Sequence, residues 1–184
     1  MLRRTNTKDL LAQSLEQLAS TRSINKIRIS DITGNCGLSS PMFYYYYKDS
    51  DDIINYIFRS QFEKRMENAP EEMDYEWFLN QLSEMIREKY TFYHNVLQNT
   101  SGVNSLYNSS AVCVLEYIQS QIRKDFDDEE IPAALDLMLE FHINGIRTKY
   151  CDMIITGLPE SSAETLELFL GTLPSDLKPY MMHH

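Results

Sequence analysis

The segment from Ile29 to Ile53 limits most strongly how this chain can fold. Gly37 lies near its middle, where a tight turn between two crossed helices needs positive φ, which only glycine adopts without steric cost. Helical signals lie on both sides of this glycine and again after residue 50. We therefore expect short helices near residues 30–36 and 40–46, followed by a long helix.

Polar residues suited to begin helices support these boundaries. Ser30 is placed to cap the first short helix, and Ser39 or Ser40 the second, because a serine hydroxyl accepts a bond from a free backbone N–H. Pro41 follows in the first turn, where its missing N–H is not needed. Leu38 completes the turn as a small apolar plug.

The second short helix carries more aromatic residues than one buried face can hold. Phe43 and Tyr47 are four residues apart, so they share a face and should pack inward. The run of tyrosines at 44–47 points in several directions around a helix, so at most two of them can be well buried. An aromatic-rich core helix explains this pattern poorly. A recognition helix lying in a DNA major groove explains it better.

The stretch CGLSSPMFYYYYKDSDDI, from Cys36 to Ile53, resembles the helix-turn-helix of the TetR family of bacterial regulators. It departs from the family pattern at Tyr47, where Phe is usual, and at Ser50, where a charged residue is common. The resemblance covers roughly residues 8–62. It is closest to TetR-like regulators of Gram-positive bacteria, including those of dihydroxyacetone kinase operons.

The resemblance assigns roles to the side chains of the second short helix. It implies that Tyr44, Tyr46 and Lys48 contact phosphates, and that Ser40, Met42 and Tyr45 face base edges with Pro41 packed beside them. Because this helix has no Arg or Asn, specificity is expected to depend on apolar contacts, DNA shape and the nearby Arg28. The complete predicted DNA-binding set is Arg3, Arg4, Arg28, Ser30, Ser39, Ser40, Pro41, Met42, Tyr44, Tyr45, Tyr46 and Lys48.

The charge distribution favours DNA contact at one end of the molecule. The net charge is −10, yet residues 1–48 hold seven Lys/Arg and three Asp/Glu, a net of +4. The remainder holds 10 basic and 24 acidic residues, a net of −14. A basic end on an acidic body suits a protein that meets DNA with that end only.

Apolar residues at helical spacing predict an all-α protein, without strand-like alternation. We expect a three-helix DNA-binding domain at residues 1–49 and a helical bundle domain at 50–184, for dimerisation and effector binding. The expected helices outside the motif cover residues 5–21, 50–67, 77–98, 106–125, 131–156 and 161–173, the last with a capping box of Ser161 and Glu164.

The second domain contains residues suited to an apolar effector pocket, with two histidines as polar contacts. The alternative is that these residues are only the core of a helical bundle. The resemblance supports a pocket, because members of the family often bind an effector there. The candidates are Phe62, Phe78, Tyr90, Tyr93, His94, Tyr107, Tyr117, Met138, Phe141 and His142.

The last two helices carry a wide apolar arc that predicts a homodimer. Gly145 lies within the first of them, where close approach of another helix would explain why glycine is tolerated. The alternative is that this apolar surface is buried within one chain. The predicted interface residues are Leu139, Ile143, Ile146, Tyr150, Leu166, Phe169, Leu170 and Leu173.

Other classes of function have little support. Cys36, Cys113 and Cys151 are far apart, which argues against disulfides, and the histidines lack metal-ligand spacing, so we expect no metal, no cofactor and no catalysis. His183 and His184 could belong to a purification tag. No segment has the ~20 apolar residues that span a bilayer. Without a signal peptide, the expected location is the cytoplasm.

We therefore expect a TetR-like transcriptional regulator that binds double-stranded operator DNA as a homodimer. The resemblance implies that a small apolar effector or a protein partner shifts the molecule between two states. Repression is the usual outcome in the family, although the subgroup with regulators of dihydroxyacetone kinase operons includes activators. The alternative is a helical protein–protein adaptor that has kept the fold and has weak or no DNA binding.

Overall fold

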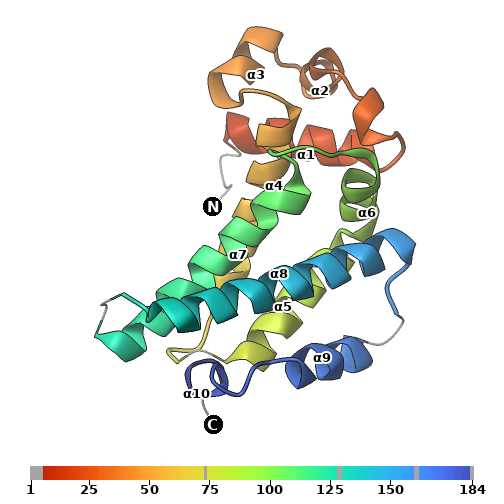
Figure 1. Cartoon of the computed structure of the whole chain (residues 1–184). Helices are drawn as coiled ribbons and strands as arrows, with labels where there is room; N and C mark the ends of the chain where they lie inside the picture. The colour runs from red at the N-terminus through yellow and green to blue at the C-terminus, as the bar shows by residue number, and fades with distance from the viewer. Residues whose placement is uncertain (1–5, 73, 128–129, 160–161, 183–184) are drawn as a thin grey trace.

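The computed structural model describes residues 6–72, 74–127, 130–159 and 162–182, and these residues form an all-helical protein (Figure 1). The predicted fold class is thus confirmed. Apart from an isolated bridge between Asp74 and Met182, the described residues lie in helices and connections. The helices are α1 (Thr7–Ala19), α2 (Ile29–Asn35), α3 (Ser40–Tyr46), α4 (Ser50–Met66), α5 (Tyr75–Glu88), α6 (Tyr90–Asn99), α7 (Leu106–Ile122), α8 (Ala133–Thr156), α9 (Ser162–Gly171) and α10 (Lys178–Met181), with 3₁₀ turns at Ile24–Lys26 and Arg123–Phe126.

Helices α1, α2 and α3 form one end of the molecule, and α4 runs from them into the body beside α7 (Figure 1). This unit has its own apolar centre, in which Leu11 and Leu15 of α1 meet Ile32 of α2 and Phe43 of α3, all at most 1% exposed. Burial of apolar surface is the main source of its stability. The centre continues along α4 into the core of the body.

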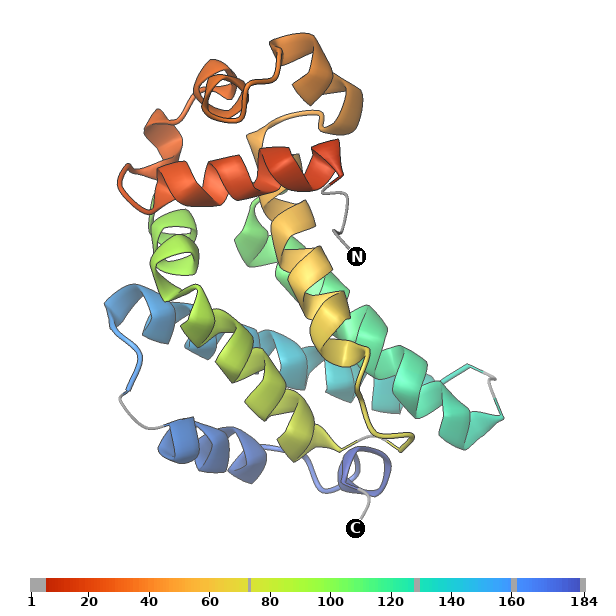
Figure 2. The same cartoon turned by 180° about the vertical axis from the view of Figure 1, so that it is seen from behind.

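The body is a bundle in which α8 packs across α6 and α7, and α9 lies against α5 at the end away from α3 (Figures 1 and 2). Aromatic rings fill the space between α4, α5 and α7. Phe62 meets Phe78 and Tyr117 edge to face, with ring centroids 6.2 and 5.5 Å apart. This geometry is favourable for aromatic pairs.

Asn95 of α6 fastens the body to the N-terminal unit. Its side-chain N–H groups donate to the carbonyl oxygens of Ala19 (2.8 Å) and Arg22 (2.7 Å), and its oxygen accepts from the Ile24 N–H (3.0 Å). These bonds satisfy backbone groups that the end of α1 leaves without a helical partner. The end of α1 is therefore held directly by α6.

Two expectations about the helices were wrong. The predicted helix at 77–98 is interrupted at Lys89, whose backbone (φ −123°, ψ 34°) is not helical. The interruption lets α6 turn toward α1, where Lys89 pairs with Glu16. Helix α10 was not predicted. The helix expected at 131–156 begins later, at Ala133, with Pro132 as its N-cap, and Ser161, the predicted cap of α9, lies outside the described residues.

None of the helices in the described part of the chain is both long and apolar enough to cross a membrane.

Candidate nucleic-acid interface and internal cavity

The turn between α2 and α3 has the predicted geometry. Gly37 has a φ of +71°, and the Leu38 N–H donates to the Thr33 carbonyl at 2.8 Å, which closes the end of α2. The predicted cap of α2 was wrong. Ser30 lies inside the helix and is exposed, whereas Asp31 accepts a bond from the Arg28 N–H at 3.0 Å. A carboxylate at this place also interacts favourably with the helix dipole.

Helix α3 is anchored by one face and exposed on the other, as predicted. Phe43 is 0% and Tyr47 2% exposed, whereas Met42 is 39%, Tyr44 59% and Tyr45 79% exposed. These apolar and aromatic side chains thus form an exposed surface on one short helix. This surface lies at the end of the molecule formed by α2 and α3 (Figure 1).

Most of the other predicted DNA contacts lie on the same end. Tyr46 is half-buried, and its ring meets that of Tyr45 edge to face with centroids 4.9 Å apart. Arg3 and Arg4 lie outside the described residues. Ser40 is also half-buried, and the exposed members of the set are Arg28, Ser30, Ser39, Pro41 and Lys48.

Tyr47, where the family pattern has Phe, holds α3 to α1 through its hydroxyl group. The hydroxyl donates to the Lys8 carbonyl at 3.0 Å, and burial raises the pKa of Tyr47 above its usual range. The neighbouring Tyr56 donates to Asp9 at 2.7 Å; burial and then this bond raise the pKa of Tyr56 to about 12. Both tyrosines are therefore neutral donors at physiological pH.

The positive charge of this end is only partly neutralised. The Lys8 ammonium lies 4.1 Å from the Tyr56 ring centre, a favourable cation–π contact, and Arg22 pairs with Asp31 at 3.6 Å. Lys26, Arg28 and Lys48 are exposed and form no ion pair with any residue that the structure describes. These three cations are available to an anionic partner.

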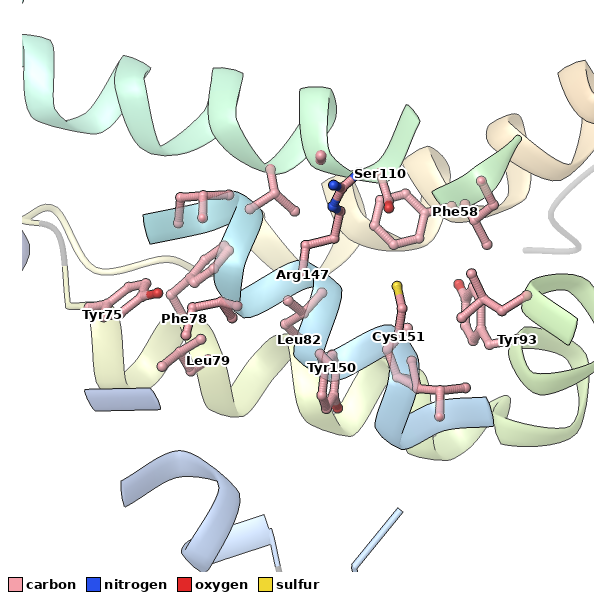
Figure 3. A pocket seen from close by; sticks show the side chains of 18 residues that line it. Phe58, Tyr75, Phe78, Leu79, Leu82, Tyr93, Ser110, Arg147, Tyr150 and Cys151 are labelled. Carbon is pink, nitrogen blue, oxygen red and sulfur yellow. The ribbon is translucent and has the colours of Figure 1, made fainter. Parts of the chain in front are cut away.

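A second feature is a cavity inside the body, with a volume of about 60 Å³ (Figure 3). Its wall is almost entirely apolar and is built from α4, α5, α6, α7 and α8. Such a volume corresponds to about two water molecules at their volume in the liquid. The few polar groups in the wall include Arg147, Cys151 and Ser110, of which Arg147 carries the charge.

Two of the ten predicted pocket residues, Phe78 and Tyr93, line this cavity. The others have different surroundings because helical spacing shows that a residue is apolar-facing but not which neighbour it meets. Phe62 and Tyr117 belong to the aromatic cluster beside the cavity, and His142 is bonded to the Tyr75 hydroxyl at 2.9 Å.

The remaining predicted pocket residues lie at the margins of the body. Tyr107 covers the guanidinium of Arg147 on the outside, and Phe141 is 72% exposed. Tyr90 donates to the Ile154 carbonyl at 3.1 Å, with His94 beside its ring. Met138 lines a shallow hollow between α8 and the end of α9.

Sequence reasoning missed Arg147 and Cys151 as cavity residues. A signal was present for Arg147, which is four residues after Ile143 and three before Tyr150, within the predicted apolar arc. A cation at such a position must be explained by a partner or a ligand. Burial raises the pKa of the Cys151 thiol to about 11, so this group is neutral.

The predicted dimer residues are mostly used inside this chain. Leu139, Ile143, Tyr150, Phe169 and Leu173 are at most 8% exposed, so their side chains have little surface left for a partner. Ile146, Leu166 and Leu170 are half-buried against the same core. Helices α6 and α7 cover much of the apolar arc of α8, and α5 covers that of α9.

A different arc of the same helices is exposed. Leu137 is 53% and Phe141 72% exposed on α8, and Leu168 of α9 is 52% exposed. A Cβ placed on Gly145 would meet no atom of this chain within 4 Å, so this glycine also faces open space.

Among the described residues, no group of His, Cys, Asp and Glu is arranged to hold a metal ion.

Comparison with known proteins places this architecture among the solved structures. No protein-family model and no curated protein sequence matches the chain. The structure of the dihydroxyacetone kinase operon activator DhaS is similar with a TM-score of 0.68 and 15% sequence identity, over 95% of this chain and 98% of that one. A TetR-family transcriptional regulator from Streptomyces coelicolor is similar with a TM-score of 0.61 and 17% identity, over 89% of this chain and 77% of that one. The chain therefore has the all-helical fold of TetR-like transcriptional regulators, as the motif at Cys36–Ile53 predicts.

Proposed function

We propose that this protein is a TetR-like transcriptional regulator that binds operator DNA through α3. The observation that carries the proposal is the division of α3 into two faces. Phe43 and Tyr47 anchor the helix in the core, while Met42, Tyr44 and Tyr45 extend into solvent. A helix fixed in this way can enter a major groove as a rigid element, with its free side chains against bases and phosphates.

Charge supports the same assignment. Lys26, Arg28 and Lys48 are exposed cations without an ion-pair partner in the described part of the chain, at the end where α3 lies. Their contacts with phosphates would release counterions, which is the main source of affinity for DNA. The proposal therefore divides the chain into a DNA-binding domain at 1–49 and an acidic body at 50–184.

Two copies of the body would pair to present two α3 helices to one operator. The exposed arc of α8 and α9 is suited to this role, because Leu137, Phe141 and Leu168 would be buried by a second copy. Gly145 would allow close approach of the two α8 helices. A two-fold axis between them gives an isologous interface and a palindromic operator with half-sites ~34–36 Å apart.

The cavity would couple an effector to DNA binding. A ligand that prefers one arrangement of the walls, from α4 to α8, shifts the population toward that arrangement. Because α4 leads directly to α3, such a shift changes the spacing of the two recognition helices. Repression in the absence of effector is the expected outcome. A neighbour of similar fold is an operon activator, so a reporter gene assay must decide the sign.

The experiment that tests DNA binding is fluorescence anisotropy on sequences selected by the protein from random DNA. We expect tight binding that weakens with salt, and Lys48→Ala should reduce the salt slope by about 0.9. Lys178→Ala is the matched control, because Lys178 is also exposed but lies on α10, at the far end of the molecule. Failure to select any sequence, or an unchanged slope for Lys48→Ala, would contradict the proposal.

An adaptor that binds only protein is the second candidate. It is favoured by the net charge of −10 and by the absence of Lys and Arg between Ser40 and Tyr46. Retention on heparin or DNA separates the two candidates, because an adaptor shows no salt-dependent retention. Under either candidate we propose a cytoplasmic protein without catalytic activity or cofactor.

A further inference from the structure

Arg147 brings a positive charge into an apolar cavity. It extends from α8 toward α7, with its guanidinium near Ser110 (Figure 3). The surrounding wall is formed by side chains such as Phe58, Leu82 and Tyr93. A charge next to an apolar wall is costly unless an opposite charge or several hydrogen bonds compensate it.

The guanidinium is only partly compensated by the protein. One terminal nitrogen, Nη1, donates to the Tyr107 carbonyl at 2.9 Å, and the Tyr107 ring lies 4.3 Å from the guanidinium carbon. The Nε–H is buried and has no hydrogen-bond partner among the described residues. No described carboxylate forms an ion pair with Arg147. One edge of the guanidinium thus remains without a partner.

The other polar groups of the cavity do not supply a counterion. Burial raises the pKa of Cys151 to about 11, despite the opposing effect of Arg147, so the thiol is protonated at physiological pH. Ser110 is neutral. The cavity therefore combines an apolar wall with a single cation that the protein compensates only in part, and this combination is complementary to an apolar anion.

We infer that the ligand of this cavity is a small apolar molecule with one acidic group, held by the Nε edge of Arg147. This inference rests on the proposed function, in which the cavity is the effector site, and it specifies the chemistry of the effector. A carboxylate can accept two parallel bonds from one edge of a guanidinium. The volume of about 60 Å³ holds only part of such a molecule, and because the cavity is partly open, a short apolar chain can extend beyond it.

The test compares three six-carbon probes that differ only in the head group: hexanoate, hexanol and hexylamine. Isothermal titration calorimetry on the full chain should show that hexanoate binds most tightly and hexylamine least. Arg147→Met, which keeps the apolar stem, should weaken hexanoate by about tenfold or more and leave hexanol nearly unchanged. Arg147→Lys should keep part of the preference for the acid, because it retains the charge and loses the planar edge.

Arg87→Met is the matched control. Arg87 is also half-buried with an Nε that lacks a partner, but it donates to the Pro159 carbonyl and does not line the cavity. Hexanoate affinity should be unchanged in this variant. Circular dichroism verifies folding of each variant, and if Arg147→Met is unfolded, Arg147→Gln replaces it in the titration.

Equal affinity for hexanoate and hexanol, equal loss in the Arg87 and Arg147 variants, or no binding of hexanoate at all would overturn the inference. Operator binding by the ligand-free protein is measured separately by anisotropy. If that binding persists when the titrations fail, the assignment of the ligand is wrong while the regulator function stands. If operator binding fails while hexanoate still binds the wild type more tightly than Arg147→Met, the ligand assignment stands and the proposed DNA binding is wrong.

Discussion

The hydroxyl of Tyr93, in the wall of the cavity, donates to the side-chain oxygen of Gln61 at 2.8 Å. The amide nitrogen of Gln61 in turn donates to Glu16 of α1 at 2.9 Å, and Lys89 pairs with the same carboxylate. A continuous set of hydrogen bonds therefore connects the cavity to the helix on which α3 rests. A movement of Tyr93, which is also part of the buried core, would therefore alter the partners of α1.

The first prediction concerns this connection. Gln61→Leu should lower the free energy of unfolding by about 1–3 kcal/mol, because it leaves the buried Tyr93 hydroxyl without a partner. Adding Tyr93→Phe removes the orphaned hydroxyl, so the double variant should lose less than the sum of the two single variants. Urea denaturation of the four proteins measures this coupling. Strict additivity would show that the bond contributes nothing.

The second prediction concerns pH. Burial lowers the pKa of His142 below its ordinary value of 6.5, and its ring is bonded to the Tyr75 hydroxyl. The unfolded chain then binds a proton at a higher pH than the folded chain, so the free energy of unfolding falls as pH drops below about 6.5. His142→Gln should remove this part of the dependence. Denaturation of the wild type and of His142→Gln at pH 7.5 and 5.5 tests this prediction. It would be contradicted if the free energy of unfolding fell by the same amount in both proteins between the two pH values.

The N-terminal unit could be predicted closely from the sequence, because its signals are local. Gly37 fixes a turn that needs positive φ, and Phe43 is buried on the inward face of α3 as expected, with Tyr47 buried just beyond the helix as its C-cap. Ser30 failed as a cap because α2 begins at Ile29, which places Ser30 inside the first turn, while Asp31 accepts from the Arg28 N–H. The residue at which a helix begins depends on atomic geometry that spacing does not contain.

The third prediction tests the packing of this unit. Phe43→Ala should lower the free energy of unfolding by about 3–5 kcal/mol, because it opens a cavity at a site that is 0% exposed. Tyr45→Ala, at 79% exposed, is the control and should change it by no more than about 0.5 kcal/mol. Thermal and chemical denaturation give both values. A stable Phe43→Ala protein would show that α3 is not anchored by this ring.

The body was less predictable, because its features depend on contacts between distant segments. The interruption at Lys89 accompanies its pairing with Glu16, which is 73 residues earlier in the chain. Hydrophobic periodicity also did not distinguish the buried side of α8 from its exposed side. It grouped Ile143, which is buried, with a dimer surface, and it assigned Phe141 to a pocket although that ring is exposed. Which helix covers which face is a tertiary property.

The fourth prediction separates positioning from recognition on α3. Tyr44→Ala should weaken binding to all sequences by a similar factor, because a phosphate contact carries no sequence information. Met42→Ala and Tyr45→Ala should change which bases are preferred at the positions that they face. Sequence selection with each variant, followed by anisotropy on selected and scrambled duplexes, distinguishes the two patterns. A shift in base preference for Tyr44→Ala would reverse its assigned role.

The last prediction concerns the second copy of the chain. If the exposed arc of α8 and α9 forms the dimer, Phe141→Asp should place a charge in its centre and convert the protein to a monomer, because an unpaired buried charge is costly. Val112→Asp is the matched control, since Val112 is 53% exposed on α7, outside the proposed interface. Light scattering at micromolar concentration should give the dimer mass for the wild type and the control.

The monomeric variant also tests the operator. Each half-site alone provides few contacts, so Phe141→Asp should bind a palindromic duplex much more weakly than the wild type does, while its single α3 remains intact. Half-site duplexes should be bound equally by the two proteins, because they engage one recognition helix in either case. A wild type that is itself monomeric, with or without DNA, would refute the interface, and the palindromic operator would be refuted with it.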